Sequence, residues 1–422
     1  MEHNYLPRVV DKKIKEMLTI SGGILIAGPR DVGKTETGIH FSNSCILLGN
    51  TKELDKVKLN TEEALKGKTP HLIDEWQFLP SLFNDIKQEI DSRRQFGQFI
   101  LSGSSAPDDD ITMHSGAGRI SKIFLRPMSL FESGNSSNEV NFVSLFKSKC
   151  KISGTQKCNL EFYVDKILRG GWPRYINLKG QKVKSVIRKY VENIVDIDMR
   201  KLKSPPDSMR MYELTKALAR NVATQAAIKT LSREAETGSI DKKNNEYGDK
   251  TTRKYLDQLS QVYVLEELQA WKTHARSSVR LLEKSKWYFI DPSIATAILD
   301  MSYEKLMNDK NYFGFIFESL AIRDLRIYAD AIDGVVYFFK DSNGFDVDAI
   351  IELPDGSWSA FEIKLGSTEG IEQGAATLKN LKNKVDEKKM KLLKSLNVVT
   401  TNTGSYTRSD GINIIELANL FI

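Results

Sequence analysis

Short apolar runs alternate with helix-length amphipathic segments over the first third of the chain. The apolar runs are GGILIAG from Gly22, HLIDEW from His71 and GQFILSGSS from Gly97, and the segment LPSLFNDIKQEIDSRR separates the second run from the third. Short apolar runs bounded by glycine or acidic residues are typical of buried strands. Because these strands alternate with helices, the pattern predicts a parallel α/β sheet.

The pattern becomes helical from residue 185 to residue 270. Apolar residues recur every three or four positions in VIRKYVENIVDIDMRKL, MYELTKALARNVATQ and TTRKYLDQLSQVYVLEEL, as in helices with one buried face. Beyond Lys286, a helix FGFIFESLAIRDLRIYA and the strands GVVYFFK, DVDAIIEL and SAFEIKL indicate a second α/β unit. The polar, turn-rich residues 130–160 predict a linker or lid.

We therefore expect three domains and an α/β fold class. A parallel-sheet domain is expected over residues 1–135, a helical lid and middle domain over 136–275, and a second α/β domain over 276–422. A chain of 422 residues, of which 41% are hydrophobic, has the length and composition for several ordinary cores.

Composition narrows the class of protein. The formal net charge of +6, from 61 basic and 55 acidic residues, is too mild for a nucleic-acid coat or a membrane-surface protein. Cys45, Cys150 and Cys158 have neither the number for a disulfide framework nor the paired spacing of a zinc site, which favours a reducing compartment. No apolar run reaches about 18 residues, so we expect a cytoplasmic protein without a membrane partner.

The segment GPRDVGKT fits the phosphate-loop pattern G-x-x-x-x-G-K-[ST] and lies between a predicted strand and a predicted helix, as that motif requires. The glycines let backbone amides face phosphates, Lys34 neutralises phosphate oxygens, and Thr35 offers its hydroxyl to magnesium. The segment therefore predicts binding of ATP with Mg²⁺. The residues expected to hold the nucleotide are Gly28, Pro29, Arg30, Asp31, Val32, Gly33, Lys34 and Thr35.

Two acidic residues end the second apolar strand, where a magnesium site needs them. Asp74 is expected to bind Mg²⁺ together with Thr35. Glu75 is expected to orient or deprotonate the water that attacks the γ-phosphate. The alternative is that both acids only cap the helix that follows.

Two further residues are candidates for the nucleotide site. Ser104 follows the third strand, where a polar side chain can sense the γ-phosphate, although serine after a strand is also ordinary turn chemistry. Arg119 is a candidate to stabilise the transferring phosphoryl group in its own or in a neighbouring subunit, and the second case predicts a homo-oligomer. The alternative for Arg119 is an ordinary exposed arginine.

Seven segments of the chain carry a resemblance to one family. In order they are AGPRDVGKT, HLIDEWQ, FILSGSS, the GR before LRPMSLFE, RGGWPRY, YFIDPSIA and FEIK. Over residues 5–415 the chain resembles the prokaryotic AAA-type (AAA+-like) P-loop ATPases that carry a C-terminal domain of uncharacterised function. The resemblance implies a P-loop ATPase core, a winged-helix-like middle and a restriction-endonuclease-like α/β domain at the end. The chain departs from the family pattern in FDVD, where many members have a glutamate two residues before the aspartate.

The last third of the chain resembles the PD-(D/E)xK nuclease superfamily. In DVDAIIEL and SAFEIKL, strand alternation puts Asp346 and Asp348 on one face and puts Glu362 and Lys364 on one face of the next strand. The superfamily pattern implies that Asp348 and Glu362 hold Mg²⁺ or Mn²⁺, that Lys364 positions or activates water, and that Glu318 from the preceding helix completes the set. Asp346 is an outer neighbour of this site or a solvent-facing residue.

The helical middle has the element order of a winged helix. NVATQAAIKTLSREAE and TTRKYLDQLSQVYVLEELQAW predict a helix, a turn, a second helix and a hydrophobic strand. Lys250, Arg253 and Lys254 at the start of the last helix are candidates for contacts to DNA phosphates. The alternative is a packing helix whose lysines form its solvent-facing side.

Two functions remain open from the sequence. In the first, ATP hydrolysis is coupled to a C-terminal domain that binds or cuts DNA or RNA, and nucleotide state switches access. In the second, the protein is a nucleotide-driven switch whose C-terminal domain is catalytically inactive and docks a protein partner. The second is favoured by the mild net charge and by basic segments that also fit solvent-facing sides of helices. The E-x-K pattern is short, and such domains often persist as interaction modules after catalysis is lost.

Overall fold

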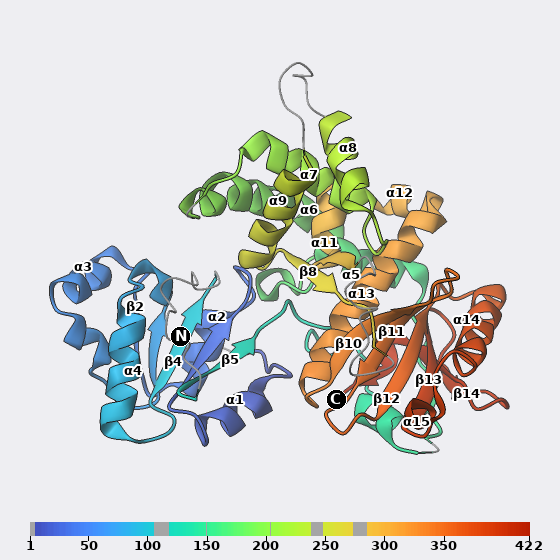
Figure 1. Cartoon of the computed structure of the whole chain (residues 1–422), viewed down its shortest axis with the longest axis horizontal. Coiled ribbons are helices and arrows are strands. Elements are labelled where there is room, and N and C mark those ends of the chain that lie inside the picture. The colour runs from blue at the N-terminus through green and yellow to red at the C-terminus, as the bar shows by residue number, and fades with distance from the viewer. Residues whose placement is uncertain (1–4, 105–117, 149, 203, 238–247, 273–284) are drawn as a thin grey trace. The chain divides into compact units, whose positions relative to one another are not determined.

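The chain folds into two compact units (Figure 1). The first comprises residues 1–127 with 261–263, and the second comprises residues 128–260 with 264–422. The computed structural model describes residues 5–104, 118–148, 150–202, 204–237, 248–272 and 285–422. No helix in these described ranges is long and apolar enough to cross a membrane.

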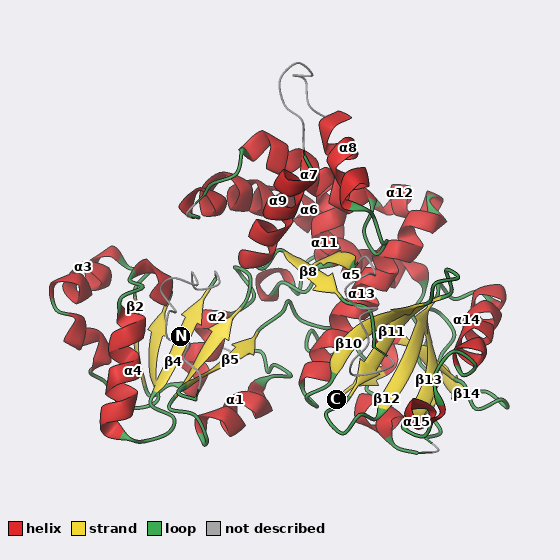
Figure 2. Cartoon of the chain, viewed as in Figure 1, coloured by secondary structure: helices red, strands yellow, loops and turns green. Residues whose placement is uncertain are grey.

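The first unit contains a five-stranded parallel sheet with the strand order β2-β3-β4-β1-β5. Its strands are β1 Gly23–Ala27, β2 Ser44–Leu47, β3 His71–Asp74, β4 Phe99–Gly103 and β5 Ile120–Phe124. Its helices are α1 Asp11–Leu18, α2 Lys34–Phe41, α3 Thr51–Leu59 and α4 Leu82–Arg93 (Figure 2). Every position of β1, β3 and β4 is buried, as expected for central strands covered on both faces. The predicted parallel α/β sheet is confirmed.

The apolar pattern does not predict the two edge strands of this sheet, β2 and β5. Their side chains are only partly buried, and β5 carries Lys122 at its centre. An edge strand faces solvent along one side, so it tolerates polar residues and its apolar signal weakens. Edge position therefore explains why these two strands escape detection.

The second unit contains a helical part that starts at residue 160. Its helices are α5 Leu160–Arg169, α6 Gly180–Asn193, α7 Ser208–Arg220, α8 Ile228–Thr237, α9 Asp249–Gln261 and α11 Pro292–Ile298. After α9 comes an antiparallel pair of strands, β8 Leu265–Leu268 and β9 Lys286–Phe289. Helices followed by a strand pair is the order expected for a winged helix, and the winged-helix assignment itself stays a prediction.

The second unit also contains a seven-stranded mixed sheet with the order β10-β11-β12-β13-β15-β14-β7. Its strands are β7 Ser153–Gly154, β10 Val335–Lys340, β11 Asp346–Glu352, β12 Trp358–Ile363, β13 Leu393–Thr400, β14 Ser405–Thr407 and β15 Asn413–Glu416. The helices of this part are α12 Tyr303–Asn308, α13 Lys310–Asp330, α14 Thr368–Leu381 and α15 Glu387–Met390. Helix α13 packs on β10, β11 and β12, and α14 packs on β12 and β13.

Residues 128–154 belong to the second unit and are not the linker or lid that their polar composition predicts. Strand β6 Val140–Asn141 pairs with β16 Leu420–Phe421, and β7 pairs with β14. The Phe142 ring lies 6.3 Å from the ring of Phe361 in β12, and the hydroxyl of Ser359 donates to the carbonyl of Leu145. A few buried apolar residues attach this segment to the rest of the unit. Because most of its residues are polar, its average composition does not reveal them.

The first unit ends at Pro127, whereas the sequence predicts a boundary at residue 135. Residues 136–275 and 276–422 lie within one compact unit apart from 261–263. The division between a middle and a C-terminal domain therefore stays a prediction.

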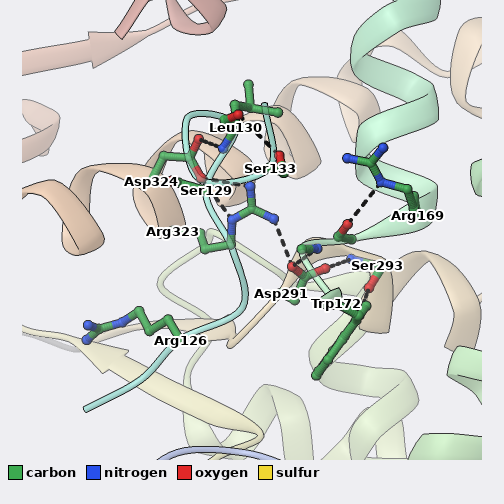
Figure 3. Close-up of polar contacts among 12 residues, drawn as sticks. Arg126, Ser129, Leu130, Ser133, Arg169, Trp172, Asp291, Ser293, Arg323 and Asp324 are labelled. Carbon is green, nitrogen blue, oxygen red and sulfur yellow. Dashed lines mark hydrogen bonds and ion pairs between the residues drawn. The ribbon is translucent and has the colours of Figure 1, made fainter. Parts of the chain in front are cut away.

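A buried ion network joins distant segments of the second unit (Figure 3). The guanidinium of Arg323 in α13 lies 2.8 Å from Asp291 Oδ2 and 2.7 Å from Asp324 Oδ1. Asp291 also accepts the backbone N–H of Gly171, and Asp324 accepts that of Leu130. Three of the segments that carry the family resemblance, LRPMSLFE, RGGWPRY and YFIDPSIA, meet at these residues. The network thus connects residues 128–132 and 169–175 to α11 and α13.

Candidate functional site

The loop between β1 and α2 has the backbone shape of a phosphate loop. At Gly28, where φ is +156°, an added Cβ would lie 2.2 Å from the carbonyl oxygen of Leu125. At Gly33, φ is +95°, in the region that favours glycine. Gly33 is also the N-cap of α2, and it has no side chain to occupy the free N–H groups of the first turn. Those amides are available to an anion, as at other phosphate-binding helix starts.

Lys34 is a buried ammonium next to this loop. Its side chain is 5% exposed, and its Nζ donates to the carbonyl oxygen of Pro29 at 2.7 Å. Burial lowers the pKa of Lys34 to about 8, against the opposing effect of Glu75 and Asp74. A phosphate near Nζ would stabilise the charged form that burial disfavours.

Thr35 and Asp74 form the pair expected to hold magnesium. The hydroxyl of Thr35 donates to both carboxylate oxygens of Asp74, at 3.0 and 3.1 Å. The hydroxyl of Ser102 in β4 also donates to Asp74. Hydroxyl and carboxylate oxygens are the ligands that Mg²⁺ prefers, so these residues fit the ion.

Glu75 lies one residue beyond Asp74 and contacts Ser104. Its backbone is left-handed, with φ of 54°, and Ser104 Oγ lies 3.4 Å from its Oε2. The side-chain amide of Gln77 donates to the same carboxylate and to Ser104. Glu75 makes no side-chain cap to the short helix that follows, and Asp74 binds Thr35 and Ser102. The alternative that both acids only cap a helix is therefore not what the structure shows.

Arg8, which the sequence analysis does not predict, hydrogen-bonds to the backbone of the phosphate loop. Its guanidinium donates to the carbonyl oxygen of Val32 at 2.8 Å and to that of Arg126 at 2.6 Å. The side chain is 6% exposed. Every residue has a backbone carbonyl, so the partners of Arg8 leave no recognisable motif in the sequence. Helix α1 lies between Arg8 and the strand that precedes the loop, so the position of Arg8 in the sequence gives no signal either.

Arg119 does not lie at the phosphate loop of its own chain. It precedes β5, and the register Gly23↔Ile120 puts it at the amino end of the sheet, whereas the loop follows Ala27 at the carboxyl end. The length of β1 separates the two ends by about 13 Å. Arg119 Nε instead lies 2.7 Å from Asp91 Oδ1 at the surface. A role in a neighbouring subunit stays a prediction.

In the second unit, four predicted residues come together in a buried cluster. Lys364 Nζ lies 2.8 Å from Glu362 Oε2 and 3.5 Å from Asp348 Oδ2. The ladder between β11 and β12 stops at Ala349, and Asp348 Oδ2 instead accepts the N–H of Ile363. Glu318 in α13 reaches the same cluster through Lys286, which contacts both Glu318 and Asp348. Asp346 is exposed at the start of β11.

Two residues of this cluster were absent from the sequence prediction: Lys286 and Tyr288, both in β9. Lys286 Nζ lies 3.2 Å from Glu318 Oε1 and 3.8 Å from Asp348 Oδ1, and the Tyr288 hydroxyl lies 2.5 Å from Glu318 Oε1. Each residue of this buried set is less than a tenth exposed: Glu318, Asp348, Glu362 and Lys286. The alternating pattern of KWYF places Lys286 and Tyr288 on one face of β9, which was an available signal.

Burial and mutual repulsion shift the protonation of this cluster. Burial raises the pKa of Glu318, against the opposing charge of Lys286. Burial also raises the pKa of Glu362, with a further contribution from Asp348. Burial alone would lower the pKa of Lys286, but Glu318 and Asp348 raise it above the usual lysine range. Shifts of this kind are concentrated at functional sites in proteins.

The cluster does not have the arrangement of a ready metal site. Over the ranges that the structure describes, no group of three or more His, Cys, Asp or Glu side chains could hold a metal ion. The predicted ligands Asp348 and Glu362 are instead paired with lysines. Their role as metal ligands therefore stays a proposal that requires some rearrangement.

The basic residues of α9 and of the Lys-rich segment behave differently. Lys250, Arg253 and Lys254 are exposed at the start of α9, while its opposite side is buried, so both sequence alternatives stay open. The Lys-rich segment is LKNLKNKVDEKKMKLLK, residues 378–394, for which the sequence predicts one helix. It contains the end of α14 and the whole of the separate helix α15. Three of its lysines form ion pairs with acids of the second unit, namely Lys379 with Asp410, Lys384 with Asp341 and Lys389 with Glu352. Part of the positive charge of this segment is therefore neutralised within the second unit.

Three family models match successive parts of the chain. Residues 21–133 match a model described as an AAA domain. Residues 160–305 and 313–420 match two models described as domains of unknown function, DUF8612 and DUF4143. Together with the phosphate loop and the parallel sheet, the first match supports an AAA-type, P-loop ATPase-like domain in the amino-terminal part.

Similar proteins were found among curated sequences and solved structures. Uncharacterized proteins of Mycobacterium tuberculosis and Mycobacterium bovis are each 23% identical to this chain over 361 residues, which cover 82% of it and 71% of the relative. The structure of a Walker-type ATPase of Pyrococcus abyssi is 14% identical in sequence. The match covers 71% of this chain and 97% of the ATPase chain, with a TM-score of 0.45. The Aeropyrum pernix ORC1 protein, solved in complex with DNA, is 10% identical in sequence. The match covers 71% of this chain and 95% of the ORC1 chain, with a TM-score of 0.28.

Proposed function

We propose that this protein binds ATP with Mg²⁺ and hydrolyses it at the amino-terminal phosphate loop. The observation that carries the proposal is the convergence of Lys34, the Thr35–Asp74 pair and Glu75 at the carboxyl ends of β1 and β3. Ligands bind at this edge in open parallel sheets. A cation, a pair of magnesium ligands and a general base are the parts that phosphoryl transfer to water requires.

Each residue has a defined task in this proposal. The amides of the loop and of the first turn of α2 bind the phosphates, and Lys34 neutralises their charge. Magnesium, held by Thr35 and Asp74, supplies charge neutralisation at the phosphate oxygens. Glu75 accepts the proton of the attacking water. Ser104 and Gln77 fix the orientation of the Glu75 carboxylate.

The affinity for ATP should fall by about tenfold between pH 7 and pH 9. Because burial lowers the pKa of Lys34 to about 8, the free protein carries a mostly charged lysine at pH 7 and a mostly neutral one at pH 9. Only the charged form attracts phosphate, so the loss occurs as the pH rises through 8. The Kd for ATP with Mg²⁺, measured by calorimetry at both pH values, tests this.

Lys34→Met is the matched control for this titration. It should bind ATP more weakly than the wild type at pH 7 and lose the tenfold difference between the two pH values. An unchanged wild-type Kd from pH 7 to pH 9 would refute the role of the Lys34 charge. A folded wild-type protein that gives no heat with ATP at either pH would overturn the whole proposal.

A second candidate function is cleavage of DNA or RNA by the C-terminal cluster. The observation that favours it is the convergence of Glu318, Asp348, Glu362 and Lys364 at one buried point of the second unit. With Asp348 and Glu362 as ligands of Mg²⁺ or Mn²⁺, Lys364 would position the water. The competing candidate is a non-catalytic domain that docks a protein partner and responds to the nucleotide state.

Lys364→Ala should lower cleavage of labelled single- and double-stranded DNA or RNA in Mn²⁺ or Mg²⁺ by about tenfold, because the water loses its positioning group. The control is Lys384→Ala, which removes an ion pair with Asp341 at a distance from the cluster and should leave the rate unchanged. If the wild type and both variants leave all substrates intact, cleavage is refuted and the protein-docking function is the remaining candidate.

A further inference from the structure

Both carboxylate oxygens of Asp348 already face a cation. Lys286 Nζ lies 3.8 Å from Oδ1 of Asp348, and Lys364 Nζ lies 3.5 Å from Oδ2. Lys286 also contacts Glu318 at 3.2 Å, and Lys364 contacts Glu362 at 2.8 Å. The two ammonium groups therefore take the positions from which a divalent cation would approach the acids.

We infer that Lys286 is the resident counter-cation of the C-terminal acid cluster and competes with a divalent metal ion for it. The inference concerns the site of the proposed C-terminal function, but it does not depend on whether that site cleaves anything. A metal ion binds Asp348 and Glu318 only when Lys286 leaves them. The lysine is thus a built-in competitor that disfavours metal binding at the cluster in the free protein.

Charge and burial support this assignment. Three carboxylates, Glu318, Asp348 and Glu362, face two ammonium groups, so the cluster is nearly neutral without any metal. Lys286 is 4% exposed, and a buried ammonium is stable only when it is paired with carboxylates. The Tyr288 hydroxyl adds a hydrogen bond to Glu318, so this acid is already satisfied.

Metal geometry points to the same conclusion. Mg²⁺ needs oxygen ligands at about 2.0–2.1 Å and repels a neighbouring ammonium group. Lys286, in β9, contacts Glu318 from α13 and Asp348 from β11, so three elements meet at this lysine. Binding of a metal ion would therefore displace Lys286 and break its ion pair with Asp348, which is one of the contacts between β9 and the mixed sheet.

Mn²⁺ binding to the full chain without nucleotide tests the inference. The free ion is measured by electron paramagnetic resonance for the wild type, Lys286→Met, Asp348→Asn and the double variant. Wild type and Asp348→Asn should bind equal amounts of Mn²⁺. Lys286→Met should take up one additional ion per chain, with at least about tenfold higher affinity at this cluster, because the competing charge is gone. The double variant should lose this ion.

Lys286→Arg and Lys384→Met serve as controls, because the first keeps the charge and the second removes a lysine that pairs with Asp341. Both should bind Mn²⁺ as the wild type does. Lys286→Gln, which keeps a hydrogen bond to Glu318, replaces Lys286→Met if the latter fails to melt cooperatively. A wild-type ion that Asp348→Asn removes would overturn the inference, and so would a folded Lys286→Gln that gains no ion. Both readouts are independent of ATP binding and of nucleic-acid cleavage.

Discussion

Glu75→Gln is expected to lower kcat for ATP hydrolysis by about 10²- to 10⁴-fold while leaving the Kd for ATP nearly unchanged. The substitution keeps the size of the side chain and removes the carboxylate that is the proposed proton acceptor. Lys34 and the Thr35–Asp74 pair, which are the proposed ligands of the nucleotide and its metal ion, are untouched. Steady-state phosphate release and calorimetry with ATP, run on the same preparation, separate the two quantities.

Two matched variants show whether Glu75 acts as a base or as a structural element. Gln77→Leu leaves the carboxylate in place but removes the amide that orients it, so kcat should fall less than in Glu75→Gln. Glu63→Gln, which removes a carboxylate from an exposed ion pair with Lys66, should not change kcat. Equal phosphate release by Glu75→Gln and the wild type would show that another group receives the proton.

Arg323→Met is expected to lower the free energy of unfolding of the second unit by about 3–5 kcal/mol. The substitution leaves Asp291 and Asp324 buried without their cation, and both are 0% exposed. Burial already raises the pKa of Asp324, against the opposing charge of Arg323. Urea unfolding followed by circular dichroism measures the change. Because the network joins four segments, the whole unit should lose stability.

The control for this prediction is a surface arginine. Arg188→Met removes the pair between Arg188 Nη2 and Asp300 Oδ1, whose side chains are 37% and 57% exposed, and should cost about 0–1 kcal/mol. Adding Asp291→Asn to Arg323→Met should recover part of the loss, since one unpaired charge disappears. A loss below about 1 kcal/mol in Arg323→Met would mean that the two aspartates find other partners or protons.

The sequence predicts best those features whose residues are neighbours in the chain. The phosphate loop is a continuous run of eight residues that follows β1, and Asp74 and Glu75 end β3 of the same sheet. Because the strands are parallel, their carboxyl ends share one edge, which places the acids at the same edge as the loop. The same reasoning placed Asp348, Glu362 and Lys364 on adjacent strands. In each case a short motif and one strand register contain the required information.

Residues that act through distant partners could not be predicted in this way. Lys286 meets Glu318 across 32 residues, and Arg323 meets Asp291 across the same separation. Arg8 binds carbonyl oxygens, which every residue offers. Apart from the alternation in KWYF, which places Lys286 and Tyr288 on one face of β9, the local pattern does not distinguish these side chains from exposed basic residues. Arg119 shows the opposite error, because its place beside a family segment suggested the nucleotide while the strand direction puts it at the other end of the sheet.

The pairing of β6 with β16 and of β7 with β14 has a consequence for biosynthesis. Ser136 bonds to the carbonyl oxygen of Leu420, which is 284 residues later in the chain. At about 5–20 residues per second, the ribosome needs on the order of 15–60 s to supply these partners. Until then Val140, Phe142 and Leu145 have no sheet to bury them. We therefore expect the nascent second unit to expose these apolar side chains during this interval, although the amino-terminal sheet already has all of its strands.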